Sequence, residues 1–273
     1  MRIFDTLAGA SQFAWVLWHS ALSARREAES ELWRYLREII DFIHQLGQAY
    51  RFEDYLREVP LTTPPYLSTA LDSREEACLR RAMALALKAL EETSDPQQAR
   101  HALVFINLLN FLAETGQLAD FEDFFTHRLD YAPLAIASFA TREEAEAWLK
   151  EVAEPPSPAR VLIGDEYYLA WYSREDGSRD VTRDFTIEPY IEEFTARGVP
   201  PNAPSFKSRE EAEAWLATHP ASPFAFLSID GERYFAVHHK RLKRHTLHPV
   251  ARSLGEWEEE KKAAERRTPL PPG

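Results

Sequence analysis

Residues 138–149 read SFATREEAEAWL, and residues 205–216 read SFKSREEAEAWL. The two stretches lie 67 positions apart and differ at only two positions. Thr141 and Ser208 each stand three residues before a glutamate, which is the capping-box pattern that opens an α-helix. Trp148 and its counterpart then lie on the apolar face of that helix. A sequence that repeats itself this closely predicts a repeated structural unit.

Each copy continues into a predicted β-hairpin. Gly164 and Gly231 occupy matching positions between runs of β-branched and aromatic residues, as a tight hairpin turn requires. A further turn at residues 175–177 predicts a third strand in the first copy, and we expect another after Lys240 in the second. Two such units would form either one shared antiparallel sheet backed by two helices or two small tandem modules.

The first half of the chain repeats with an offset of 69 residues. Gly47-Gln48 falls on Gly116-Gln117, and FEDY at 52–55 falls on FEDF at 121–124. In each copy an apolar-periodic helix ends at the glycine, where a left-handed C-terminal cap is favoured, and a short helix follows. A capping box at residues 73–76 opens the second copy. The helices are expected over about 6–22, 25–46 and 50–58, and over about 73–92, 97–115 and 119–128.

These patterns predict an α+β protein. Its N-terminal domain is all-helical and made of two three-helix repeats, and two tandem repeats of a helix plus an antiparallel hairpin or meander follow. The 273 residues suffice for two domains of ordinary size. We place the helical domain at 1–132 and the α+β domain at 133–250, with repeats at about 138–190 and 205–250. Residues 251–273 predict a charged helix and a proline-rich tail.

The charge balance narrows the classes of partner. With 32 Lys and Arg against 44 Asp and Glu, the formal net charge is -12. The protein therefore lacks the general attraction for phosphates on which nucleic-acid binders depend, and a basic partner suits it better. A single cysteine, Cys78, argues against a disulfide framework and indicates a reducing compartment. The apolar stretch 7–24 is interrupted by polar residues, so we predict a cytoplasmic protein with no signal peptide and no membrane partner.

No catalytic, metal or cofactor site is predicted. The sequence contains no GxSxG, GxxxxGK[ST], GxGxxG or HExxH pattern, and its 9 glycines leave few loops that could cradle a phosphate. The paired acids Glu53-Asp54 recur as Glu122-Asp123 beside the same aromatics, so we interpret them as scaffold at the start of a short helix. We expect a protein that is not an enzyme and that needs no cofactor and no metal.

One stretch has the composition of a protein-binding surface. Aromatic residues are followed closely by acids, and at interfaces aromatic anchors supply affinity while charges set the association rate. An ordinary acidic surface over core aromatics explains the same pattern and stays open as an alternative. The candidate partner-binding residues are Tyr167, Trp171, Tyr172, Asp176, Asp180, Asp184, Glu188, Glu192 and Glu193.

A basic, histidine-rich stretch occurs only in the second α+β copy. Alternation along a strand places neighbouring histidines on opposite faces, so a metal site would need a turn to gather them. A phosphate or nucleic-acid patch is one alternative, and a solvated strand edge protected by cations is another. The stretch contains the possible basic patch Lys240, Arg241, Lys243 and Arg244 and the histidines His238, His239, His245 and His248.

Two of these patterns together resemble a known family. They are the helix followed by Gly-Gln and Phe-Glu-Asp, and the run Phe-x-[Thr/Ser]-Arg-Glu-Glu-Ala-Glu-Ala-Trp-Leu followed by a hairpin with Gly-Glu-x-Tyr. They resemble the paralogous proteins encoded beside toxin genes in myxobacteria, which act as cognate immunity proteins in kin-recognition toxin systems. The resemblance covers most of residues 25–237 and carries over no binding residues.

The resemblance implies a cytoplasmic protein that binds one toxin and blocks it sterically, without catalysis. Combined with the negative charge, it favours an immunity protein that neutralises a basic toxin domain. Two other functions stay open at this point. One is a structural or adaptor protein, and the other is a nucleic-acid-associated regulator that acts through Lys240–Arg244. The sequence does not indicate the oligomeric state.

Overall fold

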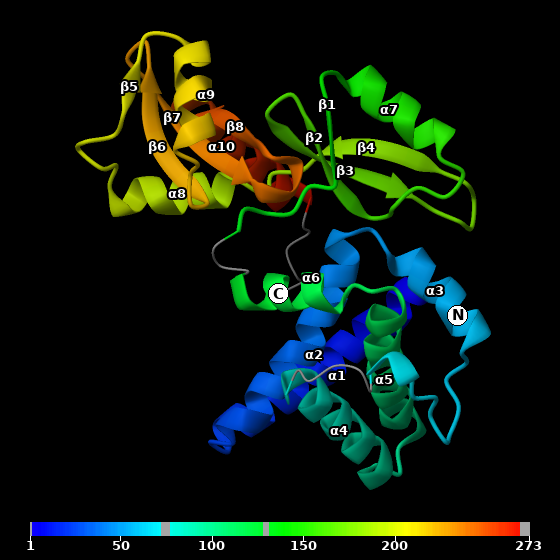
Figure 1. Cartoon of the computed structure of the whole chain (residues 1–273). Helices are drawn as coiled ribbons and strands as arrows, with labels where there is room; N and C mark the ends of the chain where they lie inside the picture. Colours follow the sequence, from blue (N-terminus) through cyan, green and yellow to red (C-terminus); the bar gives the residue numbers. More distant parts are fainter. Residues whose placement is uncertain (1, 72–76, 128–130, 268–273) are drawn as a thin grey trace. The chain divides into compact units, whose positions relative to one another are not determined.

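The computed structural model describes residues 2–71, 77–127 and 131–267 and has the predicted α+β architecture (Figure 1). Its described part contains ten α-helices and two four-stranded mixed sheets. The contacts divide the chain into two compact units. Unit 1 consists of Met1–Arg128 together with Pro156–Pro158, and unit 2 consists of Leu129–Pro155 together with Ala159–Gly273.

The secondary-structure elements of unit 1 in its described part are helices joined by loops. Its helices are α1 (Ile3–Ser23), α2 (Glu27–Gln45), α3 (Ala49–Glu58), α4 (Ala77–Glu92), α5 (Pro96–Glu114) and α6 (Leu118–His127), with a short 3-10 turn at Thr69–Leu71. In α2 the residues Leu32, Leu36 and Ile43 recur at helical spacing, and all three are buried. Every residue of α5 from 102 to 113 is buried, so α5 is the central helix of unit 1.

Aromatic contacts between the two halves of unit 1 are reciprocal. Phe42 packs on Phe121 and Phe52 packs on Phe111, and both pairs of ring centroids are 5.6 Å apart. Under the 69-residue offset Phe42 matches Phe111 and Phe52 matches Phe121, so each contact is the counterpart of the other. Such pairs add about 0.5–1.5 kcal/mol each beyond the area that they bury.

The glycines that end α2 and α5 differ in their surroundings. Gly47 and Gly116 both adopt positive φ, of 64° and 71°. A β-carbon on Gly116 would meet no atom within 4 Å, whereas one on Gly47 would lie 2.6 Å from the β-carbon of Pro156. The Gly47 carbonyl also accepts a hydrogen bond of 3.0 Å from the backbone of Ser157. The segment Pro156–Pro158 therefore lies directly against the cap of α2.

We expect Gly116→Ala to lower the free energy of unfolding of unit 1 by about 1 kcal/mol, the cost of a β-carbon at positive φ. Gly47→Ala should cost at least about twice as much, because Pro156 must also move. Urea titration of the two variants measures this difference. Equal losses would show that the segment against Gly47 yields without cost.

Unit 2 contains two separate sheets, in the strand orders β1-β2-β3-β4 and β5-β6-β7-β8. The expectation of purely antiparallel sheets is wrong in one respect, because β1 pairs parallel with β2, and β5 pairs parallel with β6. Strands of two or three residues carry no periodicity that could predict them. The strands are β1 (Ala137–Phe139), β2 (Ala159–Ile163), β3 (Glu166–Tyr172), β4 (Arg179–Arg183), β5 (Ser205–Phe206), β6 (Phe224–Ile229), β7 (Glu232–His239) and β8 (Arg244–Pro249).

Two helices of unit 2, α7 (Arg142–Glu151) and α9 (Arg209–Thr218), begin as the capping boxes predict. The hydroxyl of Thr141 accepts a hydrogen bond of 3.3 Å from the backbone of Glu144, whose carboxylate accepts one of 2.8 Å from the backbone of Ala140. The box that opens α9 has the same two hydrogen bonds. Each box satisfies two backbone N–H groups at a helix start.

Two further helices complete unit 2. The helix α8 (Glu188–Arg197) lies in the acidic stretch and was not predicted, whereas α10 (Val250–Arg267) is the expected charged helix and packs on α8. The predicted capping box at 73–76 and the proline-rich end of the chain lie outside the described residues. Within the described ranges no single helix is long and apolar enough to cross a membrane. The helices α5 and α6 meet that length and apolarity only when taken together, and they are bent by 112° relative to each other.

Strand alternation directs the side chains of each sheet into two cores. In Figure 1, α7 lies over one face of the first sheet and α9 over one face of the second, and each encloses a small core of its own. The opposite faces of both sheets share a third core with α8. Its buried members are Ala135, Leu162, Tyr167, Ile187, Ile191, Phe226, Phe235, Val237 and Val250.

Candidate functional site

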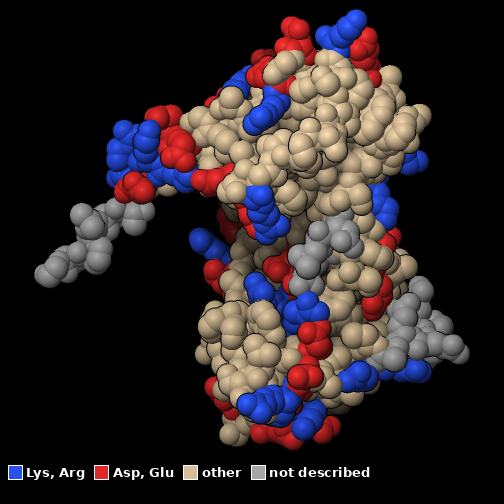
Figure 2. Space-filling model, turned by 90° about the vertical axis from the view of Figure 1, so that its left-hand side faces the viewer, with Lys and Arg blue, Asp and Glu red and all other residues tan. Residues whose placement is uncertain are grey.

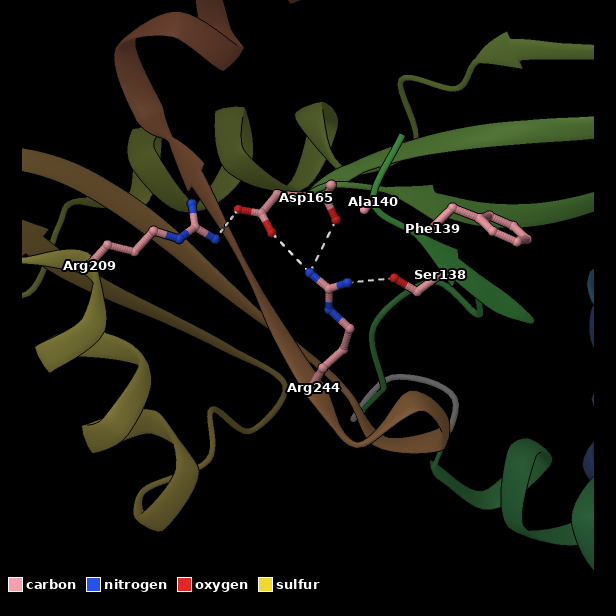
Figure 3. A pocket seen from close by; sticks show the side chains of 7 residues that line it. Ser138, Phe139, Ala140, Asp165, Arg209 and Arg244 are labelled. Carbon is pink, nitrogen blue, oxygen red and sulfur yellow. Dashed lines mark hydrogen bonds and ion pairs between the residues drawn. The ribbon is translucent and has the colours of Figure 1, made fainter. Parts of the chain in front are cut away.

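A hollow of about 640 Å³ in unit 2 has Asp165 at its centre (Figure 3). Asp165 follows Gly164 in the turn between β2 and β3, and its carboxylate forms ion pairs with Arg209 and Arg244. Arg244, at the start of β8, also donates to the hydroxyl of Ser138 and, at 3.1 Å, to the carbonyl of Gly164. The hollow therefore joins the first sheet, the second sheet and the start of α9.

The charged side chains of this hollow already bind other groups of the protein. A guanidinium group binds a phosphate or carboxylate strongly when a free edge can donate two hydrogen bonds. Arg244 uses both of its terminal nitrogens on Ser138, Gly164 and Asp165, and Arg209 binds Glu213 through Nε at 2.7 Å. The arrangement can hold the two sheets together, and we assign it that structural role.

Three of the candidate partner-binding residues lie in the core, which corrects their expected exposure. Tyr167 and Glu188 are 0% exposed and Tyr172 is 8% exposed. Tyr167 points into the shared core of unit 2, where its hydroxyl donates a hydrogen bond of 3.0 Å to the carbonyl of Pro133. The carboxylate of Glu188 binds Arg183. Strand alternation and the first turn of α8 turn these side chains inward.

Three more of the candidate acids bind groups of unit 2. Asp184 forms an ion pair of 2.7 Å with Arg160, and both side chains are partly buried. Glu192 binds Trp257 and Lys261, each at 2.9 Å, and Glu193 binds Arg197. The acidic stretch therefore does not form one continuous surface. Figure 2 likewise shows acidic and basic side chains interspersed on one face of the molecule.

Trp171, Asp176 and Asp180 are the exposed remainder of the acidic stretch. Trp171 on β3 is 37% exposed and stands in register with Asp180 on β4. The carboxylate of Asp180 accepts a hydrogen bond of 2.8 Å from the backbone of Val181, whose carbonyl accepts one of 2.9 Å from Arg142. The side chains of Asp180 and Arg142 thus bind the backbone groups of Val181 on an edge strand, which hinders pairing with another strand. Hydrogen bonds from Ser178 lower the pKa of the Asp176 carboxyl to about 2.

The basic patch also separates into residues with different partners. It lies in the turn between β7 and β8, where Lys240–Leu242 form a 3-10 turn and Lys243 adopts positive φ. The ammonium group of Lys240 lies 4.4 Å from the ring centre of Tyr131. Arg244 binds Asp165, so we assign it a structural role in place of the phosphate-binding role considered for the basic patch. Arg241 and Lys243 are exposed.

A buried hydrogen-bond chain crosses the shared core beside this turn. Nε2 of His239 and Nε2 of His248 each lie 2.9 Å from the hydroxyl of Thr246. Nδ1 of His239 lies 3.5 Å from the hydroxyl of Tyr167 on the other sheet. His239, Thr246 and His248 share one face of the second sheet, and all three are buried. The expectation of a solvated strand edge is therefore wrong for these two histidines.

One protein carbonyl fixes the direction of this chain. The Tyr167 hydroxyl donates to the carbonyl of Pro133, which can only accept, so the Tyr167 oxygen accepts from Nδ1–H of His239. Nε2 of His239 then accepts from the Thr246 hydroxyl, which in turn accepts from Nε2–H of His248. Nδ1 of His248 is left as a buried acceptor without a hydrogen-bond partner in the described structure.

Burial strongly favours the neutral histidines in this chain. The pKa of His239 and that of His248 are each lowered to about 3, first by burial and then by neighbouring positive groups, namely His248 and Arg244 for His239, and Arg183 and Arg209 for His248. His245, whose ring stacks on His238 with centroids 4.5 Å apart, has its pKa lowered to about 4, first by burial and then by His238. Among the described residues no group of three or more His, Cys, Asp or Glu side chains could hold a metal ion.

Comparison of the chain with protein-family models, with curated proteins and with solved structures gave no match. The geometry of the chain is therefore the basis for its functional interpretation.

Sequence reasoning missed the two long-range constellations of unit 2. Asp165 has Glu232 as its counterpart under the 67-residue offset. Both copies therefore have an acid at this position, and the comparison of the copies did not single out Asp165. The histidine chain had a partial signal, because His239 continues the alternation of Phe235 and Val237 along β7. On β8 the apolar Leu247 points to the other face, so only the strand register places Thr246 and His248 on the same core face as His239.

Proposed function

We propose that this chain is a non-catalytic, cytoplasmic immunity protein that binds a cognate, basic protein toxin and neutralises it by steric and electrostatic masking. The net charge of -12 is the observation that carries the proposal. Even if each of the 32 cations paired with an acid, twelve acids would remain. Complementary charge raises the association rate and selects a basic partner over a nucleic acid.

The internal symmetry of unit 1 supports the same resemblance to immunity proteins. We infer that its helices form two three-helix repeats and that unit 2 consists of two tandem helix-and-sheet modules. Gln48 donates a hydrogen bond of 2.7 Å to its own counterpart, Gln117, and the aromatic contacts exchange in the same way. Contacts of this kind suit a rigid scaffold that presents a fixed surface, which lowers the entropic cost of binding.

A pull-down from the native host at moderate salt tests the function. We expect one stoichiometric basic protein, identified by mass spectrometry, that is toxic when it is expressed without this chain. Nucleic acid detected by its ultraviolet absorbance, or a broad set of partners, would contradict the proposal and favour a regulator or an adaptor.

The exposed acids of the β3–β4 hairpin are the part of the predicted surface to test on that toxin. In Asp176→Asn with Asp180→Asn, the amide oxygens can still accept the hydrogen bonds from Ser178 and Val181, so only charge is removed. We expect the association rate to fall about 3- to 10-fold at low salt and the difference to fade at high salt. The matched control is Glu91→Gln with Glu265→Gln, two exposed acids on other elements. Equal rates in both pairs of variants would place the contact elsewhere.

A further inference from the structure

The outer face of α1 is apolar although it is exposed. Trp15, Val16 and Leu22 are 43%, 49% and 51% exposed. The ring of His19 lies 4.3 Å from that of Trp15 and 4.9 Å from that of Trp18, so the aromatic side chains form one continuous cluster. Exposed tryptophans grouped with aliphatic residues on one helix face are typical of a binding surface. The opposite face of α1 is occupied by the core of unit 1.

The charges of the chain decide which kind of partner this face can accept. Between Asp5 and Arg25 the sequence contains no Asp, Glu, Lys or Arg. A strongly basic partner would gain no electrostatic attraction on such a face. A second copy of this chain, with its net charge of -12, is repelled by acidic surface, and an uncharged face is where that repulsion is least.

The shape of the face suits a second copy in the antiparallel direction. The large exposed side chains lie in the C-terminal half of α1, whereas Ala8 and Ser11 in the N-terminal half are small. In an antiparallel pair centred on Trp15, Leu22 of one copy meets Ala8 of the other, and His19 meets Ser11. Leu22 and His19 then each face a small side chain, and the two Trp15 side chains meet at the two-fold axis, an arrangement that suits a symmetric interface.

The two ends of α1 add complementary charge. Asp5 and Arg25 each lie ten residues from Trp15, both are exposed, and neither has an ion-pair partner in the described structure. Antiparallel pairing brings Asp5 of one copy close to Arg25 of the other, twice in each dimer. We propose that α1 is the dimerisation surface of this protein and pairs antiparallel with α1 of a second copy. This inference does not depend on the proposed toxin.

Sedimentation velocity on the full chain, from about 1 to 200 µM, tests the proposal. We expect a dimer with a dissociation constant in the micromolar range, as for an interface of modest size. Trp15→Glu should raise that constant about 30-fold or more, because each dimer loses two aromatic anchors and gains two buried charges. Leu67→Glu changes a side chain of similar exposure outside α1 and should leave the constant unchanged.

A charge exchange makes the direction of pairing testable. Asp5→Lys should weaken the dimer about 10-fold, since two ion pairs become two repulsions. Adding Arg25→Asp should restore it to within about 3-fold of the native constant, and aspartate tolerates the positive φ of this position. A monomer at about 200 µM, a dimer insensitive to Trp15→Glu, or failure of the double exchange to restore association would overturn the proposal. Binding of α1 to lipid vesicles in place of self-association would overturn it as well.

Discussion

We expect unit 2 to lose about 4 kcal/mol of its free energy of unfolding between pH 7 and pH 5 because of His239 and His248. Both side chains are buried in a hydrogen-bond chain that has no place for an additional proton. Protonating Nδ1 of His248 would bury an N–H group without an acceptor, and protonating Nε2 of His239 would displace the Thr246 hydroxyl. Between pH 6.5 and pH 3 these two histidines therefore stay neutral in the folded state, whereas in the unfolded chain each of them binds a proton.

The sign and the range follow from the pKa values. An unfolded histidine has a pKa near 6.5, whereas burial lowers the pKa of these two to about 3 in the folded state. Stability is complete above pH 6.5, falls as the pH decreases, and levels off only near pH 3. At pH 5 each histidine lies about 1.5 units below its unfolded pKa and costs about 2 kcal/mol. Every charged side chain that acts on the pair, namely Arg183 of β4, Arg209 of α9, Arg244 of β8 and the neighbouring His238 and His245, opposes protonation.

Urea titrations at pH 7, 6 and 5 test this expectation when amide exchange in β7 and β8 reports on unit 2. In His239→Gln with His248→Gln, the amide groups can continue the chain through Thr246 but do not titrate. The double variant should be less stable at pH 7 and should lose much less stability than the native chain down to pH 5, with the remaining loss due to His245, whose pKa is also lowered. His219→Gln, at an exposed histidine, should keep the native slope. A double variant that loses stability as steeply as the native chain would contradict the assignment.

The order of the elements could be predicted from the sequence because it depends on local signals. The glycines at 47 and 116, the capping boxes at 141 and 208 and the hairpin glycine at 164 each act within a few residues of the structure that they determine. The helix α8 was missed because its first turn lies inside an acidic stretch that was interpreted as a binding surface. Ile187, Ile191 and Phe194 do recur at helical spacing, but three positions over about two turns are a weak signal beside the many acids.

The candidate site could be predicted only in part, because burial depends on which distant segments meet. Acids attract attention in a sequence, yet Glu188 and Asp184 acquire their environment from Arg183 and Arg160, which lie on different elements. The same limit applies to Tyr167, whose aromatic ring suits a surface and a core equally. Tyr167 and Trp171 even share one face of β3, because they lie four residues apart, and only the distant segments that pack on Tyr167 bury one and leave the other exposed.

Removing the Arg183 side chain is the other substitution from which we expect a large effect. Arg183 donates hydrogen bonds of 2.9 Å to the carbonyls of Tyr167 and Asp184, and its guanidinium binds both Glu166 and Glu188. Glu188 is completely buried, and its second carboxylate oxygen has no hydrogen-bond partner in the described structure. Burial raises the pKa of both carboxyl groups, and Arg183 is the main influence that lowers them. Arg183 therefore compensates a charge that has no access to water.

We expect Arg183→Met to destabilise unit 2 by about 3–5 kcal/mol, because a buried ion pair that loses one partner leaves an uncompensated charge. Glu188→Gln should cost less, since a neutral amide is easier to bury. The double variant should be more stable than Arg183→Met alone, and that recovery distinguishes an unpaired charge from lost packing. Arg197→Met, at an exposed pair, should cost under about 0.5 kcal/mol. If the losses of stability in the two single variants simply add in the double variant, Arg183 does not compensate the charge of Glu188. The hydrogen bonds from Arg183 to the carbonyls of Tyr167 and Asp184 then account for its effect.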